Sequence, residues 1–338
     1  MPHPLQGYLD IVAGKRPPRF RTARSLHVPF TSHDGREEQW RKHRQATAAL
    51  RTMGSHGPPV SPSLLDLKVE LARPHMNACR LCPWSCGADR GRGVRGRCGV
   101  LEARVSSDFV HLGEEAPLVP SYTIFFAGCN LQCAFCQNYD ISTRPDRGDT
   151  IPASELGNRL DRVTRSPLRG LGRVRNLNWV GGDPTPDLPY VLEVLRSMEA
   201  SVAQVWNSNM YITEEGMALL DGVMDLYLTD LKFGNDACAR RVCGALDYTS
   251  IVHANHLLAA EQGEVLVRHL LLPGHLDCCT LPIIEWLADS LPGAAVNLMD
   301  QYRPEHKAGE HPELLATVLP EDYRQAVQKA RELGLFLL

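Results

Sequence analysis

The chain has 338 residues and a mass of 37.5 kDa, with 43% hydrophobic and 22% charged residues, which excludes a peptide, a fibrous protein and a largely disordered chain. No segment approaches the roughly 18 consecutive apolar residues of a membrane span, and the start of the chain lacks the apolar run of an export signal, so we expect a cytoplasmic protein. The formal net charge of -3 divides unevenly, because residues 1–98 carry 17 Lys and Arg against 7 Asp and Glu, whereas residues 99–338 carry 19 against 32. Basic and acidic residues are mixed in the basic part and no aromatic ladder accompanies them, which disfavours nucleic-acid binding.

Residues 1–75 are predicted to form a basic amino-terminal extension rich in Arg, Pro, Ser and His. Within it, REEQWRKHRQATAALR (36–51) consists of good helix formers, and Glu37 and Glu38 each stand four residues before a basic residue. We expect this segment to be an accessory helix that lies on the main domain.

Four cysteines follow in a segment rich in Gly and Arg, CRLCPWSCGADRGRGVRGRC. Eleven cysteines in a chain without an export signal indicate metal binding rather than disulfide bonds. Four thiolates with one short and one long spacer can close around a tetrahedral zinc ion or hold an iron–sulfur cluster. We therefore expect residues 76–118 to be a module that binds one of these two through Cys79, Cys82, Cys86 and Cys98.

From residue 119 onward, short β-rich runs alternate with amphipathic stretches whose apolar residues recur at intervals of three and four. Such alternation predicts parallel strands joined by crossover helices. We expect an α/β core domain at 119–338, either a doubly wound sheet or a full or partial barrel. The predicted strands are 122–127, 176–180, 202–206, 226–231, 265–272 and 294–299, and the predicted helices include 187–200, 214–223, 281–291 and 321–334.

The ends of the predicted strands are dense in Gly, Pro, Cys and polar residues, and in parallel α/β folds the chemistry sits at these carboxyl ends. The sharpest motif is Cys129-x3-Cys133-x2-Cys136, directly after the first strand. Three thiolates on one loop can hold a four-iron cluster and leave one iron open to another ligand. The alternatives are a zinc site that lacks its fourth ligand and three free thiols. Of the remaining cysteines, Cys238 and Cys243 are scattered, and the adjacent Cys278 and Cys279 are expected to be free thiols on a loop.

The C-x3-C-x-aromatic-C loop after a first strand resembles that of the radical S-adenosylmethionine (SAM) superfamily. HLGEEAPLVPSYTIFFAGCNLQCAFCQNYDIS, WVGGDPTP, VWNSNMY, DLYLTDLKFG, VRHLLLPGH and NLMDQYRP extend the likeness over residues 76–335, and look like the pyruvate formate-lyase activating enzyme-like branch that has an amino-terminal four-cysteine module. This resemblance implies a partial (β/α)6 TIM-type barrel. It also implies that Cys129, Cys133 and Cys136 hold a [4Fe-4S] cluster whose open iron binds SAM.

The resemblance extends to the SAM site. Gly181-Gly182-Asp183 matches the family's GGE motif, which meets the SAM amino group, but Asp replaces Glu and the carboxylate sits one methylene shorter. The contact is then expected to run through water or to need a small shift of the loop.

Further SAM contacts are expected at the ends of later strands. Asp230 and Lys232 match positions that face SAM, and Arg268 matches an arginine with a similar role. Alternation along a strand places the neighbouring His269 on the opposite side. Strand-end location alone suggests that Asn207, Ser208 and Asn209 contact SAM, unless they only form the turn, and that Trp206, Tyr302 and Arg303 line the mouth of the barrel.

The family chemistry is reductive cleavage of SAM to methionine and a 5′-deoxyadenosyl radical, which takes a hydrogen atom from substrate. The resemblance favours activation of a glycyl-radical protein, with a reducing electron donor such as flavodoxin or ferredoxin. Radical chemistry on a small molecule or peptide is the alternative, favoured if residues 1–75 cap the rim. A non-catalytic iron–sulfur or zinc protein is a third hypothesis. For the four-cysteine module we favour a second iron–sulfur cluster over zinc, because radical SAM relatives often carry one.

Overall fold

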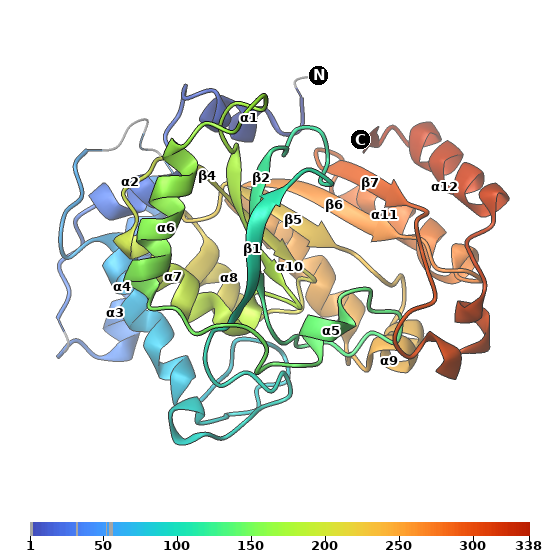
Figure 1. Cartoon of the computed structure of the whole chain (residues 1–338), viewed down its shortest axis with the longest axis horizontal. Helices are drawn as coiled ribbons and strands as arrows, with labels where there is room; N and C mark the ends of the chain where they lie inside the picture. Colours follow the sequence, from blue (N-terminus) through green and yellow to red (C-terminus); the bar gives the residue numbers. More distant parts are fainter. Residues whose placement is uncertain (1–2, 32, 52, 54–56) are drawn as a thin grey trace.

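The structure is a computed structural model that describes residues 3–31, 33–51, 53 and 57–338 (Figure 1). Eight strands form one sheet in the order β1 to β8, in which β2 to β8 are parallel and β1 is antiparallel to β2. The strands are β1 (Val105–His111), β2 (Ser121–Phe126), β3 (Asn176–Gly181), β4 (Ala203–Ser208), β5 (Leu226–Asp230), β6 (Glu264–Leu270), β7 (Ala295–Met299) and β8 (Phe336–Leu337).

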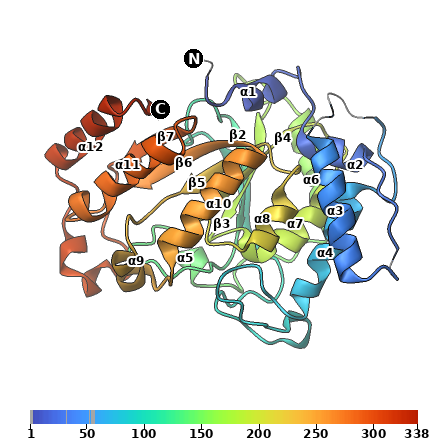
Figure 2. The same cartoon turned by 180° about the vertical axis from the view of Figure 1, so that it is seen from behind.

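The six predicted strands are β2 to β7, so the predicted partial (β/α)6 barrel is confirmed. Helices connect these strands and cover the outer face of the sheet, as Figure 2 shows for α7, α8, α10 and α11. The helices are α1 (Gln6–Val12), α2 (Arg19–Ser25), α3 (Arg36–Leu50), α4 (Leu64–Ala72), α5 (Tyr139–Ser142), α6 (Ala153–Arg165), α7 (Leu188–Ser197), α8 (Glu214–Leu220), α9 (Asp236–Cys243), α10 (Tyr248–Gln262), α11 (Leu281–Ser290) and α12 (Pro320–Glu332). None of the helices in the described part of the chain combines the length and hydropathy needed to cross a membrane.

The strand β1 was not predicted, and it lies within the segment assigned to the cysteine module. It alternates half-buried and exposed residues and pairs with β2 along its whole length. The expected boundary at residue 119 therefore runs between two paired strands. The cysteine-bearing part of the module, residues 79–98, is mostly irregular and contains one short 3-10 helix at Arg90–Arg92.

The inward face of the barrel changes character along each strand. On β5, Leu226 and Leu228 belong to a cluster of buried apolar residues inside the barrel, whereas Tyr227 belongs to the larger core between sheet and helices. The same alternation holds on β4, where Val205 points into the barrel and Trp206 points outward. The next inward positions toward the carboxyl ends are polar, namely Asn207, Asp230, Arg268 and Asn297.

The amino-terminal extension closes the opposite end of the barrel. Leu5 and Tyr8, from the start of α1, are fully buried among the inward apolar residues at the amino ends of the strands. The backbone N–H groups of Gly7 and Tyr8 donate to the Glu264 carboxylate at the start of β6, at 2.6 and 2.7 Å. Figure 1 shows α1 at the top of the molecule and α5 and α9 in its lower half. The expectation that the extension could cap the catalytic rim is therefore wrong for α1.

The rest of the described extension packs outside the barrel. The predicted accessory helix at 36–51 is confirmed as α3, which packs on α4, and α4 in turn packs on α2 and α7 at one side of the sheet (Figure 2). The helix α4 begins with a capping box, in which the Ser63 hydroxyl accepts from the Asp66 N–H and the Asp66 carboxylate accepts from the Ser63 N–H. Residues 1–2, 32, 52 and 54–56 of the extension lie outside the described residues.

Replacing Tyr8 with Ala is expected to lower the free energy of unfolding by about 3–5 kcal/mol, because a fully buried aromatic ring is lost and a cavity remains. Its hydroxyl also accepts a hydrogen bond of 2.8 Å from Asn176 Nδ2. Urea unfolding measures the change. Leu319→Ala, at a side chain that is 58% exposed, is the control and is expected to change stability by less than about 0.5 kcal/mol. Equal effects of the two variants would contradict the placement of α1.

Candidate functional site

A cavity of about 490 Å³ opens at the carboxyl ends of the strands, and it brings together residues that are far apart in sequence. All three cysteines of the loop after β2 line it. The nine residues expected to contact SAM line the same cavity: Gly181, Gly182, Asp183, Asn207, Ser208, Asn209, Asp230, Lys232 and Arg268. The cavity has the size of a small-molecule site.

Close backbone contact joins the loop after β2 to the loop after β3. Gly182 N donates to Phe126 O and Asp183 N donates to Gly128 O, at 2.9 and 3.0 Å. A Cβ on Gly182 would lie 2.1 Å from Gly128 O. Gly181 has a φ of +151°, and a Cβ there would lie 2.3 Å from Phe126 O. Both glycines are required because no side chain fits between the two loops.

The three thiols of the loop after β2 are half-buried and have polar neighbours. Cys129 Sγ accepts from Leu131 N at 3.4 Å and from Asn209 Nδ2 at 3.7 Å, and Cys136 Sγ lies 3.3 Å from the Ser142 hydroxyl. Burial raises the pKa of the Cys129 and Cys136 thiols. The pKa of the Cys133 thiol is raised most by a hydrogen bond with the Cys243 thiol, and burial raises it further. Protons must therefore leave these thiols when a metal binds.

Both carboxylate oxygens of Asp183 accept hydrogen bonds from neighbouring residues. One oxygen accepts from Thr185 N at 2.9 Å, and the other accepts from the Ser208 hydroxyl and from Asn209 N, at 3.0 and 2.8 Å. The side chain is buried, and burial raises the pKa of its carboxyl group. This carboxylate, expected to meet SAM, lines the cavity, and its hydrogen bonds join the loop after β3 to the end of β4.

Two charged residues at the end of β5 and just after it are paired within the cavity wall. Lys232 Nζ lies 2.6 Å from Asp230 Oδ2. Burial opposes the charged form of Lys232, but the Asp230 carboxylate outweighs it and raises the pKa of the ammonium group. A cationic donor is thus kept at the end of β5.

Arg268 on β6 is also paired, with two residues that sequence reasoning did not assign. Its guanidinium donates to the carboxylates of Glu114 and Glu115, with 2.7 and 2.8 Å for the two bonds to Glu115. Asn297 on β7 also donates to Glu115, at 2.7 Å. Glu114 and Glu115 stand in the HLGEEAPLVP segment that carried the family resemblance, but only the pairing of β1 with β2 brings them to the cavity.

Four other residues singled out in the sequence lie away from the cavity. His269 is buried on the opposite face of β6 from Arg268, as the alternation predicted, and its ring nitrogens bond to Leu231 O and the Thr280 hydroxyl at 2.7 and 2.9 Å. The residues expected at the mouth of the barrel were wrong, because the cavity is not lined by Trp206, Tyr302 or Arg303. Trp206 is buried in the outer core, and the Tyr302 hydroxyl donates to Leu314 O.

The four cysteines of the module line one small space directly behind the loop after β3. Cys79, Cys82, Cys86 and Cys98 surround it together with Arg90, Arg97, Thr185 and Pro186. The Arg90 guanidinium is buried and donates to Cys79 Sγ at 3.0 Å and to Pro186 O at 2.6 Å. The predicted convergence of the four cysteines thus agrees with the structure, and a cation accompanies them.

The module also contacts the other cysteine loop. Trp84 donates to Asn130 O at 2.8 Å, and the Arg97 guanidinium stacks on the Trp84 ring at 4.6 Å. A second cavity, of about 550 Å³, is lined by Cys98 and by Cys129, Cys133 and Cys136. The two cysteine groups are therefore near neighbours.

Comparisons with known proteins agree with this arrangement. The family described as "Radical SAM superfamily" matches residues 123–287. The chain is 44% identical over 279 residues to the uncharacterized protein MJ0674 of Methanocaldococcus jannaschii, covering 82% of each chain. It is 26% identical over 278 residues to the uncharacterized protein MJ0808 of the same organism, covering 76% of this chain and 77% of the relative.

Two solved structures are similar at 12% identity. They are Streptococcus suis SuiB bound to the precursor peptide SuiA, with a TM-score of 0.40 over 62% of this chain and 46% of that one, and QueE from Escherichia coli, with a TM-score of 0.38 over 71% and 94%.

Replacing Asp183 with Asn is expected to lower the free energy of unfolding by about 1–3 kcal/mol. Both carboxylate oxygens accept from an N–H group, so the NH2 group that replaces one of them in Asn would place two donors against each other. Asp183→Glu is expected to destabilise by a similar amount, since an extra methylene must enter a buried site. Urea unfolding tests both variants. Asp146→Asn, at a side chain that is 67% exposed, is the matched control and should change stability by less than about 1 kcal/mol. A gain of activity in Asp183→Glu would contradict the internal role of this carboxylate.

Proposed function

The chain belongs to the radical SAM superfamily and is an enzyme of radical chemistry, and from this premise we propose that its barrel cavity generates a radical that abstracts hydrogen from a substrate entering at the rim. A [4Fe-4S] cluster and SAM, when bound, supply a 5′-deoxyadenosyl radical for that abstraction. The observation that carries the proposal is the convergence of Cys129, Cys133 and Cys136 with the polar ends of β3 to β7 on one cavity.

The donor set fits such a cluster. Cys129, Cys133 and Cys136 are the cysteines that line the cavity, and three thiolates leave one iron of a four-iron cluster for SAM. Cys243 is the neighbouring thiol of Cys133, but it is fully buried behind the loop and lines neither cavity. We therefore assign the cluster to the three loop cysteines and leave Cys243 in the core.

The chain's own residues bind and orient SAM in this proposal. The backbone of Gly181 and Gly182 offers close approach without side chains, and Asn207 offers an amide group at the end of β4. The amide of Asn209 lines the same cavity and bonds to Asn130 Oδ1 and Tyr211 N, at 2.8 and 2.9 Å. Lys232 offers a cation that suits the SAM carboxylate. Asp183 has an indirect role in this proposal. Its carboxylate holds the N–H of Asn209 and the hydroxyl of Ser208 in place.

The four-cysteine module is proposed to hold a second iron–sulfur cluster, with zinc as the alternative. Cys98 faces the same cavity as the three loop cysteines, a position suited to electron relay. Arg92 and Arg95 of the module are exposed to 86% and 40%. Such a basic surface suits an acidic electron donor of the flavodoxin or ferredoxin type.

The proposed substrate is a glycine residue of a partner protein, which would become a glycyl radical. Support comes from the position of α1, which closes the far end of the barrel and leaves the rim to other segments. A loop of a large partner requires such access. A small molecule or a peptide is the alternative substrate, for which the paired charges of Glu114, Glu115 and Arg268 offer polar contacts. The third hypothesis is that the protein binds iron–sulfur or zinc and has no catalytic activity.

The first experiment is anaerobic reconstitution with iron and sulfide, followed by reduction and assay of 5′-deoxyadenosine formed from SAM. Cys133→Ala is expected to lose the open-iron cluster and to reduce 5′-deoxyadenosine to background. Cys243→Ala is the matched control, because it removes the adjacent thiol, and it is expected to keep most of the iron and the activity. Iron and sulfide content provides a readout besides activity.

Equal losses of iron in the two variants would contradict the ligand assignment. Intact protein with a loaded cluster that neither binds SAM nor forms 5′-deoxyadenosine would support the non-catalytic hypothesis instead.

The substrate class is tested by hydrogen transfer. A glycyl-radical protein from the same genome, labelled with deuterium at the glycine Cα, is expected to pass one deuterium into 5′-deoxyadenosine, as measured by mass spectrometry. The same protein without label is the control. If 5′-deoxyadenosine forms without deuterium from the labelled protein, activation is wrong and the small-molecule or peptide alternative replaces it.

A further inference from the structure

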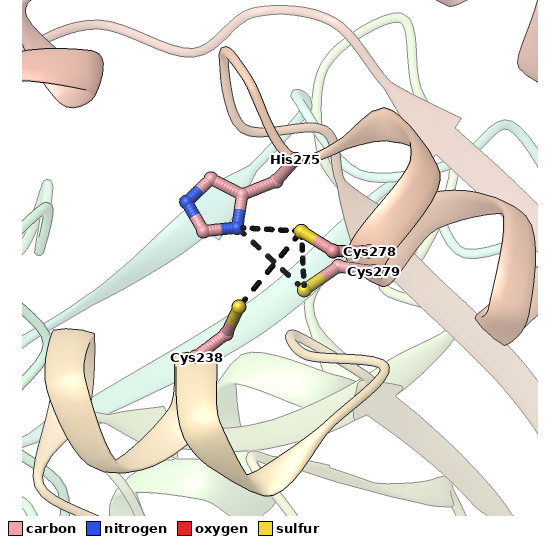
Figure 3. A group of neighbouring side chains, drawn as sticks. All are labelled: Cys238, His275, Cys278 and Cys279. Carbon is pink, nitrogen blue, oxygen red and sulfur yellow. Dashed lines mark hydrogen bonds between the residues drawn. The ribbon is translucent and has the colours of Figure 1, made fainter.

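Four side chains that the sequence left unconnected converge on one point outside the barrel cavity (Figure 3). Cys238 lies on α9, His275 follows β6, and Cys278 and Cys279 lie on the π-helical turn Leu276–Thr280. Their ligand atoms all lie within 4.8 Å of one another. Cys278 and Cys279 form no disulfide, as expected of free thiols, but the fold brings Cys238 and His275 to them.

The distances fit a single tetrahedral ion. With Zn–S bonds of about 2.3 Å and a Zn–N bond of about 2.0–2.1 Å, two sulfur ligands stand about 3.8 Å apart, and a sulfur and a nitrogen stand about 3.6 Å apart. Cys278 Sγ lies 3.8 Å from Cys238 Sγ and 3.9 Å from Cys279 Sγ. His275 Nδ1 lies 3.4 Å from Cys278 Sγ and 3.6 Å from Cys279 Sγ.

Neighbouring groups support the same four atoms. Asn235 Nδ2 donates to Cys238 Sγ at 3.3 Å and to Cys279 Sγ at 3.7 Å, and hydrogen bonds of this kind orient the thiolates that bind a metal ion. The other ring nitrogen of His275, Nε2, lies 3.8 Å from a Glu313 carboxylate oxygen and 3.4 Å from Arg241 Nη2. The Arg241 guanidinium pairs with Glu313 and stands close enough to Cys238 for their charges to interact.

We propose that Cys238, His275, Cys278 and Cys279 bind one structural zinc ion. Three thiolates and one neutral imidazole form a closed Cys3His set, which zinc prefers and which leaves no position for substrate. Binding releases the thiol protons and leaves one net negative charge, which Arg241 offsets. An iron–sulfur cluster fits less well, because its thiolates bind different irons and stand further apart than the ligands of one ion.

The zinc ion would connect two segments that follow adjacent strands of the barrel. Cys238 belongs to the β5–β6 connection, and the other three ligands belong to the β6–β7 connection. The far end of α9 supports the cluster loop, since Ala134 N donates to Val242 O at 2.8 Å and Gln132 N donates to Cys243 O at 3.2 Å. The ion therefore holds the helix on which the loop of Cys129, Cys133 and Cys136 rests.

The test compares zinc content, by elemental analysis, in protein purified with zinc in the growth medium. The double variant Cys238→Ser/Cys278→Ser is expected to contain one equivalent of zinc per chain less than intact protein, whatever the four-cysteine module binds. Asp277→Asn, an exposed neighbour on the same π-helical turn, is the matched control and should keep the full amount. Cys133→Ala should also keep this zinc, which separates the inference from the proposed cluster. Unchanged zinc in the double variant would overturn it.

A second measurement uses the unmutated protein and does not depend on the folding of a variant. Cys278 is exposed, so its alkylation by iodoacetamide can be followed by peptide mass spectrometry. Zinc-loaded protein is expected to protect Cys278 and Cys238, and removal of zinc by a chelator is expected to expose both. Equal labelling with and without zinc, or a Cys238–Cys278 disulfide in protein purified without oxygen, would overturn the proposal.

Discussion

The arrangement of the whole molecule depends on how the inward face of the parallel strands changes along their length. Burial of apolar side chains is the main favourable contribution to folding, and here the inward positions near the amino ends of the strands supply Val205, Leu228 and Leu266. Two residues further along, the same face presents Asn207, Asp230 and Arg268. The apolar half needs a cover, which α1 provides with Leu5 and Tyr8. The polar half is thereby confined to the opposite rim.

At that rim, the position of the cysteine loop is determined by backbone contacts from several parts of the chain. Gly128 O accepts from Asp183 N, Ala134 N donates to Val242 O, and Ala134 O accepts from Lys307 N. The module contributes Trp84, which donates to Asn130 O. A loop held from four directions keeps its thiols in place before any metal binds, and such preorganisation reduces the cost of binding. The proposed zinc site extends this support, because it fixes α9 beneath the loop.

Charges within the cavity are paired with one another, which resolves the cost of burying them. Burial alone penalises Lys232 and Arg268, yet the carboxylates of Asp230, Glu114 and Glu115 hold both in their charged form. A ligand that enters must therefore exchange partners with these pairs rather than neutralise isolated charges. Removal of one partner would leave the other charge buried and unpaired, so Arg268 and Glu115 act as a unit.

The sequence by itself determined the repeating strand and helix order, the position of the rim and the residues that meet there, because hydrophobic periodicity and strand-end motifs are local patterns. It also indicated that Arg268 and His269 face opposite sides, which follows from the alternation of a strand. Only the tertiary structure decided the rest. Glu114 reaches the cavity through the pairing of β1 with β2. The Asp183 carboxylate accepts hydrogen bonds from the end of β4. Cys238 meets Cys278 only because β5 and β6 are adjacent, and such contacts between distant segments have no local signature in a single sequence.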